Sequence, residues 1–166
     1  MGAVLLLAAC GVAPLAIDLL PLLGDDASGS RSVVADGDIE FRLPGDEGQA
    51  LSGYETLGVR PAAVDLVYRL ELSRDGNLAG EAFITFYLAA PGANLWSDDN
   101  RLGEAQRLDL QREIQEIAGT LSLSRSQIEA LVSGEIVIGA MISGNASGSA
   151  SIGYSFKQLT LKVAFF

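Results

Sequence analysis

Residues that could perform catalysis are scarce in this chain of 166 residues. The sequence contains no histidine, which excludes Ser-His-Asp triads and most metal-hydrolase sites. Paired carboxylates could support glycosidase chemistry, but 21 acidic residues in an acidic protein produce many accidental pairs. The single cysteine, Cys10, lies in the apolar N-terminal segment. We therefore expect no catalytic residue and no cofactor, and we expect that the protein is not an enzyme.

Two short acidic segments carry oxygen atoms that could bind a cation. They are residues 36–40 (Asp-Gly-Asp-Ile-Glu) and residues 98–100 (Asp-Asp-Asn). Neither has the Gly at position 6 and the Glu at position 12 that an EF-hand loop requires. We interpret both as loops with solvated charges, in which Asp98 or Asp99 caps a helix, and expect no metal site. Nearby, Trp96 could contact a sugar or a partner, but an aromatic side chain packed under a loop is the favoured interpretation.

The surroundings of Cys10 are the most informative feature of the sequence. An apolar run, Ala3-Val4-Leu5-Leu6, leads into Leu7-Ala8-Ala9-Cys10. This arrangement resembles the lipobox of bacterial lipoproteins. The resemblance implies that the Cys10 thiol receives a diacylglycerol, that the chain is cut just before Cys10, and that the new amine is acylated. It also implies a location in the bacterial cell envelope, anchored to a membrane and facing the periplasm or the cell exterior.

A membrane-spanning helix is the alternative interpretation of the N-terminal segment, residues 1–23. Residues 3–23 are nearly long enough to cross a bilayer, which takes about 20 residues. Asp18 near the centre would oppose insertion by about 3 kcal/mol. Pro14 and Pro21 would each interrupt the backbone hydrogen bonds of such a helix. We therefore expect residues 1–23 to be an apolar leader or membrane anchor with its lipidation site at Cys10.

Composition indicates one globular domain after this leader. Apolar residues make up 49% of the chain and charged residues 19%, as in a globular protein. The net charge of −10 argues against nucleic acid or an anionic lipid surface as a partner. Residues 24–37 are small and polar and predict a flexible tether. Residues 38–166 predict a single domain that is monomeric and soluble without the leader.

Alternating apolar residues predict two β-hairpins. Within residues 64–72, and again within residues 82–88, apolar residues occupy every even position, which indicates strands with one buried face. A three-residue turn over 75–77 would join strands 64–72 and 82–88, setting Leu70 opposite Ala82 and Glu71 opposite Glu81. A longer loop would avoid that repulsion, so the register stays open. We expect the following core positions to be nearly fully buried: Leu66, Leu70, Ile84, Phe86, Ile138 and Ile152.

The second hairpin follows the same logic. Even positions from 136 to 142 and from 150 to 156 are apolar, and the small residues 144–148 would form the turn. The apolar positions then become odd from Leu159 onward. This change at Lys157 and Gln158 predicts a β-bulge or a strand crossing between sheets.

Two short helices are expected between the hairpins. Leu110, Ile114 and Ile117 have helical spacing within residues 104–118. Ser126 and Glu129 match a capping box for a second helix over residues 126–133. The predicted fold is therefore mainly β: an antiparallel β-sandwich built on two hairpins, with a two-helix crossover near 104–133.

These patterns favour a noncatalytic, membrane-anchored envelope lipoprotein. We expect it to act as a binding or structural module for another envelope component, such as another envelope protein. One alternative is a carrier or sensor of an apolar ligand held between the sheets. The other is a carboxylate-based hydrolase, which a carboxylate pair about 5–9 Å apart in a cleft would support.

Overall fold

Two very long strands form the centre of the fold. The computed structural model describes residues 14–54 and 58–165, and within them seven strands form one antiparallel sheet. The strands are β1 (Leu15–Asp18), β2 (Ser28–Leu43), β3 (Gln49–Ser52), β4 (Ala63–Ala89), β5 (Arg101–Leu108), β6 (Ile114–Ser122) and β7 (Glu135–Ala164). The helical elements are α1 (Leu20–Leu23), the 3-10 turns η1 (Gly24–Ala27) and η2 (Asp98–Asn100), and α2 (Arg125–Val132).

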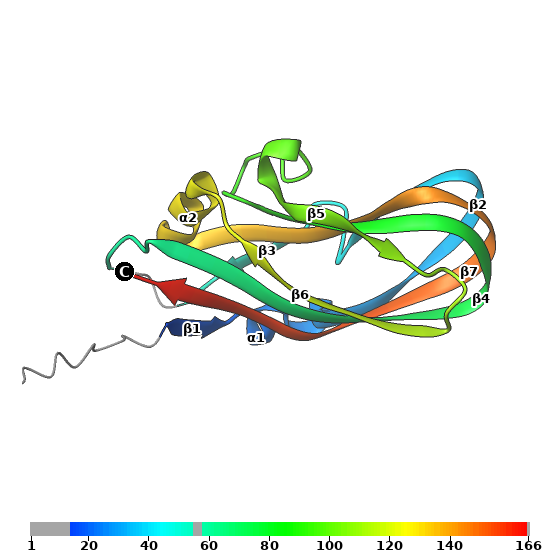
Figure 1. Ribbon diagram of the computed structural model, residues 1–166, viewed down its shortest axis with the longest axis horizontal. Helices are drawn as coiled ribbons and strands as arrows, with labels where there is room; N and C mark the ends of the chain where they lie inside the picture. Colours follow the sequence, from blue (N-terminus) through cyan, green and yellow to red (C-terminus); the bar gives the residue numbers. More distant parts are fainter. Residues whose placement is uncertain (1–13, 55–57, 166) are drawn as a thin grey trace, which may run out of the picture.

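Strand β4 pairs with β7 along its whole length while both strands bend back on themselves. The ladder runs from Ala63 opposite Ala164 to Ala89 opposite Val137. Figure 1 shows β2, β4 and β7 turning together at one end of the molecule, so that the sheet is folded in half. The two halves face each other as the layers of a β-sandwich, and their inner faces form the core.

Shorter strands complete both layers on either side of this central pair. Strands β3, β2 and β1 pair in succession with β7, and β2 follows β7 through the bend. Strand β6 pairs with the first half of β4, and β5 pairs with the second half. The predicted class, a mainly antiparallel β-sandwich, is therefore confirmed.

The expected hairpin over residues 64–88 is instead one continuous strand. Residues 75–77 form no turn, because each of them pairs with β7 as β4 rounds the bend. Leu70 lies opposite Phe156, and Ala82 lies opposite Gly144, so the expected pairing of Leu70 with Ala82 is wrong. The even-numbered apolar side chains of β4 are nevertheless all buried, because the additional residue of the bulge lies in β7 and the alternation of β4 continues through the bend.

The second expected hairpin is corrected in the same way. Residues 144–148 lie within β7 and pair with β2 on one side and β4 on the other. The predicted irregularity near Lys157 is confirmed as a bulge. Arg69 pairs with Gln158 while Leu70 pairs with Phe156, which leaves Lys157 as the additional residue. All six core positions expected from the sequence are buried, with exposures between 0% and 7%.

Close approach of the strands at the bend requires glycine. Gly80 has a φ of +136°, and a Cβ there would collide with the backbone carbonyl oxygen of Asn145. A Cβ at Gly144, on the facing strand, would collide with the carbonyl oxygen of Glu81. A side chain at either position would therefore separate the two central strands at the bend.

The expected helix over residues 104–118 is wrong. These residues lie in β5, in the connection after it and in β6, and both strands pair with β4. The three apolar residues that suggested a helical face do not share one, since Leu110 and Ile117 are buried while Ile114 is 66% exposed. Pairing with an existing strand edge overrides a local periodicity of only three residues.

The second expected helix is confirmed as α2, although its cap lies two residues earlier. Ser124 and Gln127 form the capping box, rather than Ser126 and Glu129. The Gln127 side chain is buried and also donates from Nε2 to the carbonyl oxygens of Leu88 and Asn100. The Tyr54 hydroxyl donates to the Leu131 carbonyl oxygen at 3.0 Å, and burial followed by repulsion from Glu135 raises the pKa of Tyr54 to about 12.

The N-terminal boundaries differ from those expected. Residues 28–37 of the expected tether belong to β2 and pair with β7, and residues 24–27 form η1. The described part of the expected leader also belongs to the domain, since β1 pairs with the end of β7 and Leu19 and Leu23 are buried. The small, polar composition of residues 24–37 reflects an edge strand and a bend rather than a linker.

Truncation of the inner face should destabilise the fold strongly. Leu70→Ala should lower the free energy of unfolding by about 2–5 kcal/mol, because Leu70 is fully buried and the cavity cannot collapse completely. Val34→Ala, at a side chain 85% exposed, is the matched control and should change it by less than about 0.5 kcal/mol. Urea unfolding of both variants measures the difference. Similar losses in the two variants would contradict the assignment of the faces.

Alanine substitutions at Gly37 and Gly80, two glycines at the bend, should distinguish the energetic cost of backbone strain from the cost of forcing the strands apart. Both have positive φ, +133° and +136°, but a Cβ at Gly37 meets nothing within 4 Å. Gly37→Ala should therefore lose only the strain, about 1–3 kcal/mol. Gly80→Ala should lose clearly more or fail to fold, as measured by urea unfolding. Equal losses would show that β4 and β7 do not approach closely at the bend.

Candidate functional site

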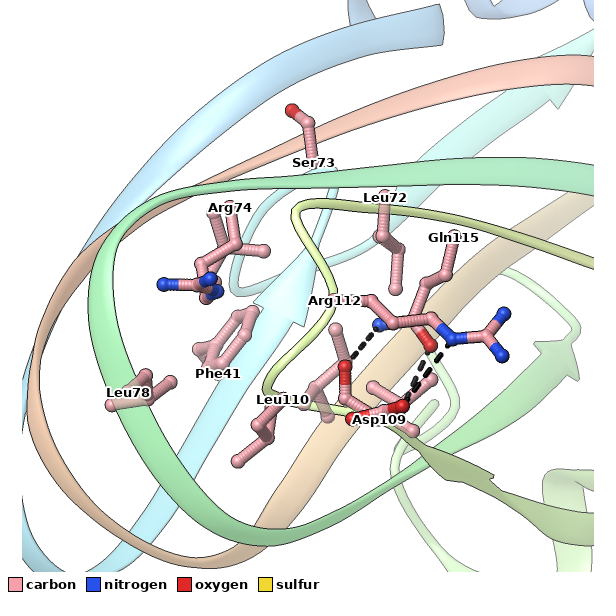
Figure 2. A pocket seen from close by; sticks show the side chains of 12 residues that line it. Phe41, Leu72, Ser73, Arg74, Leu78, Asp109, Leu110, Arg112 and Gln115 are labelled. Carbon is pink, nitrogen blue, oxygen red and sulfur yellow. Dashed lines mark hydrogen bonds and ion pairs between the residues drawn. The ribbon is translucent and has the colours of Figure 1, made fainter.

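A cavity between the two layers lies beside the bend. Its volume is about 20 Å³, and the connection between β5 and β6 closes it from one side. Figure 2 shows this connection crossing the space inside the curve of β4. Most of the lining is apolar: Phe41, Leu72, Leu78, Leu108, Leu110, Ile142 and Ile152. Polar side chains also line it: Ser73, Arg74, Asp109, Arg112 and Gln115.

Arg74 is the unusual member of this lining. Its even number places it on the inner face of β4, where the other members are mostly apolar. Its Nη2 donates to the carbonyl oxygen of Gln111 at 3.2 Å. Its Nε is buried and has no hydrogen-bond partner among the described residues. Within the same residues, no carboxylate lies within ion-pair distance of the Arg74 guanidinium, so its charge is uncompensated at close range.

The connection that closes the cavity is held by its own side chains. Asp109 accepts a hydrogen bond from the backbone of Gln111 at 3.0 Å and pairs with Arg112 at 3.3 Å. Gln115 donates to the carbonyl oxygen of Asp109 and accepts from its backbone nitrogen. The Asp109 carboxylate therefore already has Arg112 and the Gln111 backbone as partners, and it is directed away from Arg74.

Two open grooves adjoin the cavity on either side of this connection. One has a volume of about 410 Å³ and shares Arg74 and Leu78 with the cavity. The other has a volume of about 440 Å³ and shares Leu108, Asp109 and Leu110. Both volumes fall in the range of about 300–1,000 Å³ that is typical of small-molecule sites. A guanidinium at the meeting point of an apolar cavity and an open groove is suited to binding an anion.

The residues singled out from the sequence do not converge on this cavity. Cys10 lies outside the described residues. No group of three or more potential metal ligands is found among the residues described. Asp38 accepts a hydrogen bond from Asn145 at 3.1 Å, and Asp98 and Asp99 lie in η2, where neither side chain caps the turn. In the part of the chain described, no helix is long and apolar enough to cross a membrane.

Trp96 has a structural place, as the favoured interpretation expected. It packs with Tyr87 on the outer face of the sheet, with the ring centroids 5.4 Å apart. Its Nε1 donates to the carbonyl oxygen of Asp46 at 2.8 Å, and the Arg42 guanidinium lies 4.9 Å from its ring centroid. Trp96 therefore fixes the segment between β4 and β5 onto the sheet.

Arg74 was missed by reasoning from the sequence. The expected hairpin placed Arg74 in the connection between strands 64–72 and 82–88, where an exposed arginine needs no explanation. The alternating pattern contained the signal that was missed: Leu72, Arg74 and Leu78 occupy even-numbered positions and therefore lie on the same inner face of β4. A charged residue on an otherwise apolar face is a candidate for a functional role.

Comparisons with known proteins add little to this description. No protein-family model matches the chain, and no curated protein matches it in sequence. Among solved structures, the chain is similar to one in the structure of infectious bursal disease virus Gt strain, with 12% identity and a TM-score of 0.37 over 84% of this chain. A chain from the Gx strain gives 9% identity and a TM-score of 0.29 over 82%. The matches span 32% and 36% of those viral chains, about a third of their length.

Replacing Arg74 with an apolar residue of similar length should not weaken the fold. Arg74→Met removes a buried, unsatisfied donor and an unpaired charge, so the free energy of unfolding should stay constant or rise by about 1–2 kcal/mol. Arg112→Met, at an exposed ion pair, should change it by less than about 1 kcal/mol. Urea unfolding measures both. A loss above about 2 kcal/mol in Arg74→Met would show that Arg74 is retained for stability.

Proposed function

We propose that this protein is a noncatalytic, lipid-anchored protein of the bacterial cell envelope. In this proposal, its domain binds or supports another envelope component on the periplasmic or outer side of a membrane. The observation that carries the proposal is the sequence Leu7-Ala8-Ala9-Cys10, which contains the only cysteine of the chain. Acylation of this thiol would attach the domain to the membrane through its N-terminal side.

The position of β1 is compatible with such an anchor. Strand β1 begins at Leu15, five residues after Cys10, and pairs with the end of β7. Five extended residues reach at most about 17 Å, so an acylated Cys10 would hold this end of the domain close to the membrane. Figure 1 shows the bend at the opposite end of the molecule from β1. The cavity beside Arg74 would then face away from the lipid, where a ligand or partner could reach it.

Charge also supports a role away from the lipid surface. The net charge of −10 gives the domain little attraction to anionic lipids, so a covalent lipid would provide the attachment. The alternative of a carrier that holds an apolar ligand between the layers is less well supported. The cavity of about 20 Å³ is close to the size of one or two water molecules, and the inner faces are otherwise packed.

The anchor is tested by mass spectrometry of the protein from its native envelope. The mature chain should begin at a residue 10 that carries the mass of a diacylglycerol and an additional acyl group. Cys10→Ser in the full-length chain should move the protein from the membrane fraction to the soluble fraction. Val12→Ser, which leaves the thiol in place, is the matched control and should remain membrane-bound.

An intact Met1 together with a free Cys10 thiol would overturn the lipoprotein assignment. Any shortened form used for comparison must retain residues 14–23, because Leu19 and Leu23 are part of the core. Loss of membrane association in a form lacking those residues would report unfolding and not the absence of an anchor.

A further inference from the structure

We infer that the cavity at the bend, together with the groove beside it, is a binding site for the carboxylate of a small organic acid, with Arg74 as its anion-binding residue. This inference goes beyond the lipid-anchored module and does not depend on Cys10, because it rests on residues of the domain alone. The ligand class follows from three observations: the unpartnered guanidinium, the volume of the cavity, and the charges around it.

The guanidinium of Arg74 lacks an acceptor that the protein could readily have supplied. Acidic residues outnumber basic ones by 21 to 11, yet none of the described carboxylates pairs with it. The Nε hydrogen is buried without an acceptor, and an unsatisfied buried donor is destabilising, more so when it is charged. A carboxylate can accept from Nε and an Nη nitrogen together, which is the side-on geometry that guanidinium groups favour.

The space available suits a carboxylate group with a small body attached. The cavity of about 20 Å³ admits a group little larger than a water molecule. The remainder of the ligand would lie in the adjoining groove of about 410 Å³, which Arg74 and Leu78 also line. Asn77, Gln111 and Ser147 provide polar groups along this groove. A longer aliphatic chain directed inward would have to displace packed leucine side chains.

Surrounding charges favour a monoanion over a phosphate dianion. Arg74 is the cation without a close carboxylate in this lining, because the other lining arginine, Arg112, already pairs with Asp109. A second negative charge on the ligand would therefore find no additional unpaired cation among the lining residues, which include the Asp109 carboxylate.

The test uses butyrate and butyramide as probes, since they match in size and differ in charge. Each is titrated into the full-length chain while the Nε–Hε cross-peak of Arg74 is followed by NMR. Butyrate should shift this cross-peak saturably, and butyramide should bind at least tenfold more weakly. Absence of saturation with butyrate, or equal affinity for the two probes, would overturn the proposal and assign a buried water as the partner of Nε.

Variants separate the site from general effects on the fold. Arg74→Gln should weaken butyrate binding at least tenfold, as followed by backbone amide shifts of residues 77–79. Arg125→Gln, at an exposed arginine of α2 that lines neither the cavity nor the groove, is the control and should leave the affinity within about twofold. If Arg74→Gln does not fold, Asn77→Asp provides the second test, because it places a negative charge in the groove without altering Arg74. Unchanged butyrate affinity in Asn77→Asp would contradict the placement of the ligand in this groove.

Discussion

The pairing of β4 with β7 through the bend is the constraint on which the rest of this structure depends. Backbone N–H and C=O groups in the middle of a sheet must stay paired, so the fold cannot break this ladder to reverse direction. It bends the sheet instead, and the strands approach so closely that Gly80 and Gly144 accommodate no Cβ. The same bend brings the two halves face to face, creates the core, and leaves between the layers the small cavity that Arg74 lines.

The sequence predicted the buried faces of the central strands correctly but not their partners. Even parity from residue 64 to residue 88 is compatible both with a three-residue hairpin and with one bent strand, so the pattern alone does not separate them. The distinguishing information is the pairing with residues 137–164, which lie far away in the chain. Leu78 was the local sign, since it continues the even parity of the apolar residues between the two expected strands.

The two principal errors in the expected fold share a physical origin. Residues 104–118 have an apolar spacing that suits a short helix, and residues 24–37 have the composition of a linker. Both segments are strands because β4 and β7 offer long edges with free hydrogen-bonding groups, which stabilise any neighbouring segment that extends along them. Arg74 could have been identified as a candidate once β4 was known to be continuous. The volume of the cavity and the unpartnered Nε require coordinates.

The two ends of the molecule differ in what they can do. At the end where β1 joins β7, strand pairing and buried apolar side chains such as Leu19 fix residues 15–23 to the domain. An anchor at Cys10 would therefore hold this end of the domain close to the membrane. At the bend, Nε of Arg74 is the one buried side-chain polar atom of the described residues that has no hydrogen-bond partner, and it lies on an otherwise apolar face. A residue that lowers stability, such as a charged side chain on an apolar face, is often found at a functional site, because it is kept there for its function. The same bend that makes the fold possible therefore also gives Arg74 a position where a ligand, and no residue of the described chain, can complete its hydrogen bonding.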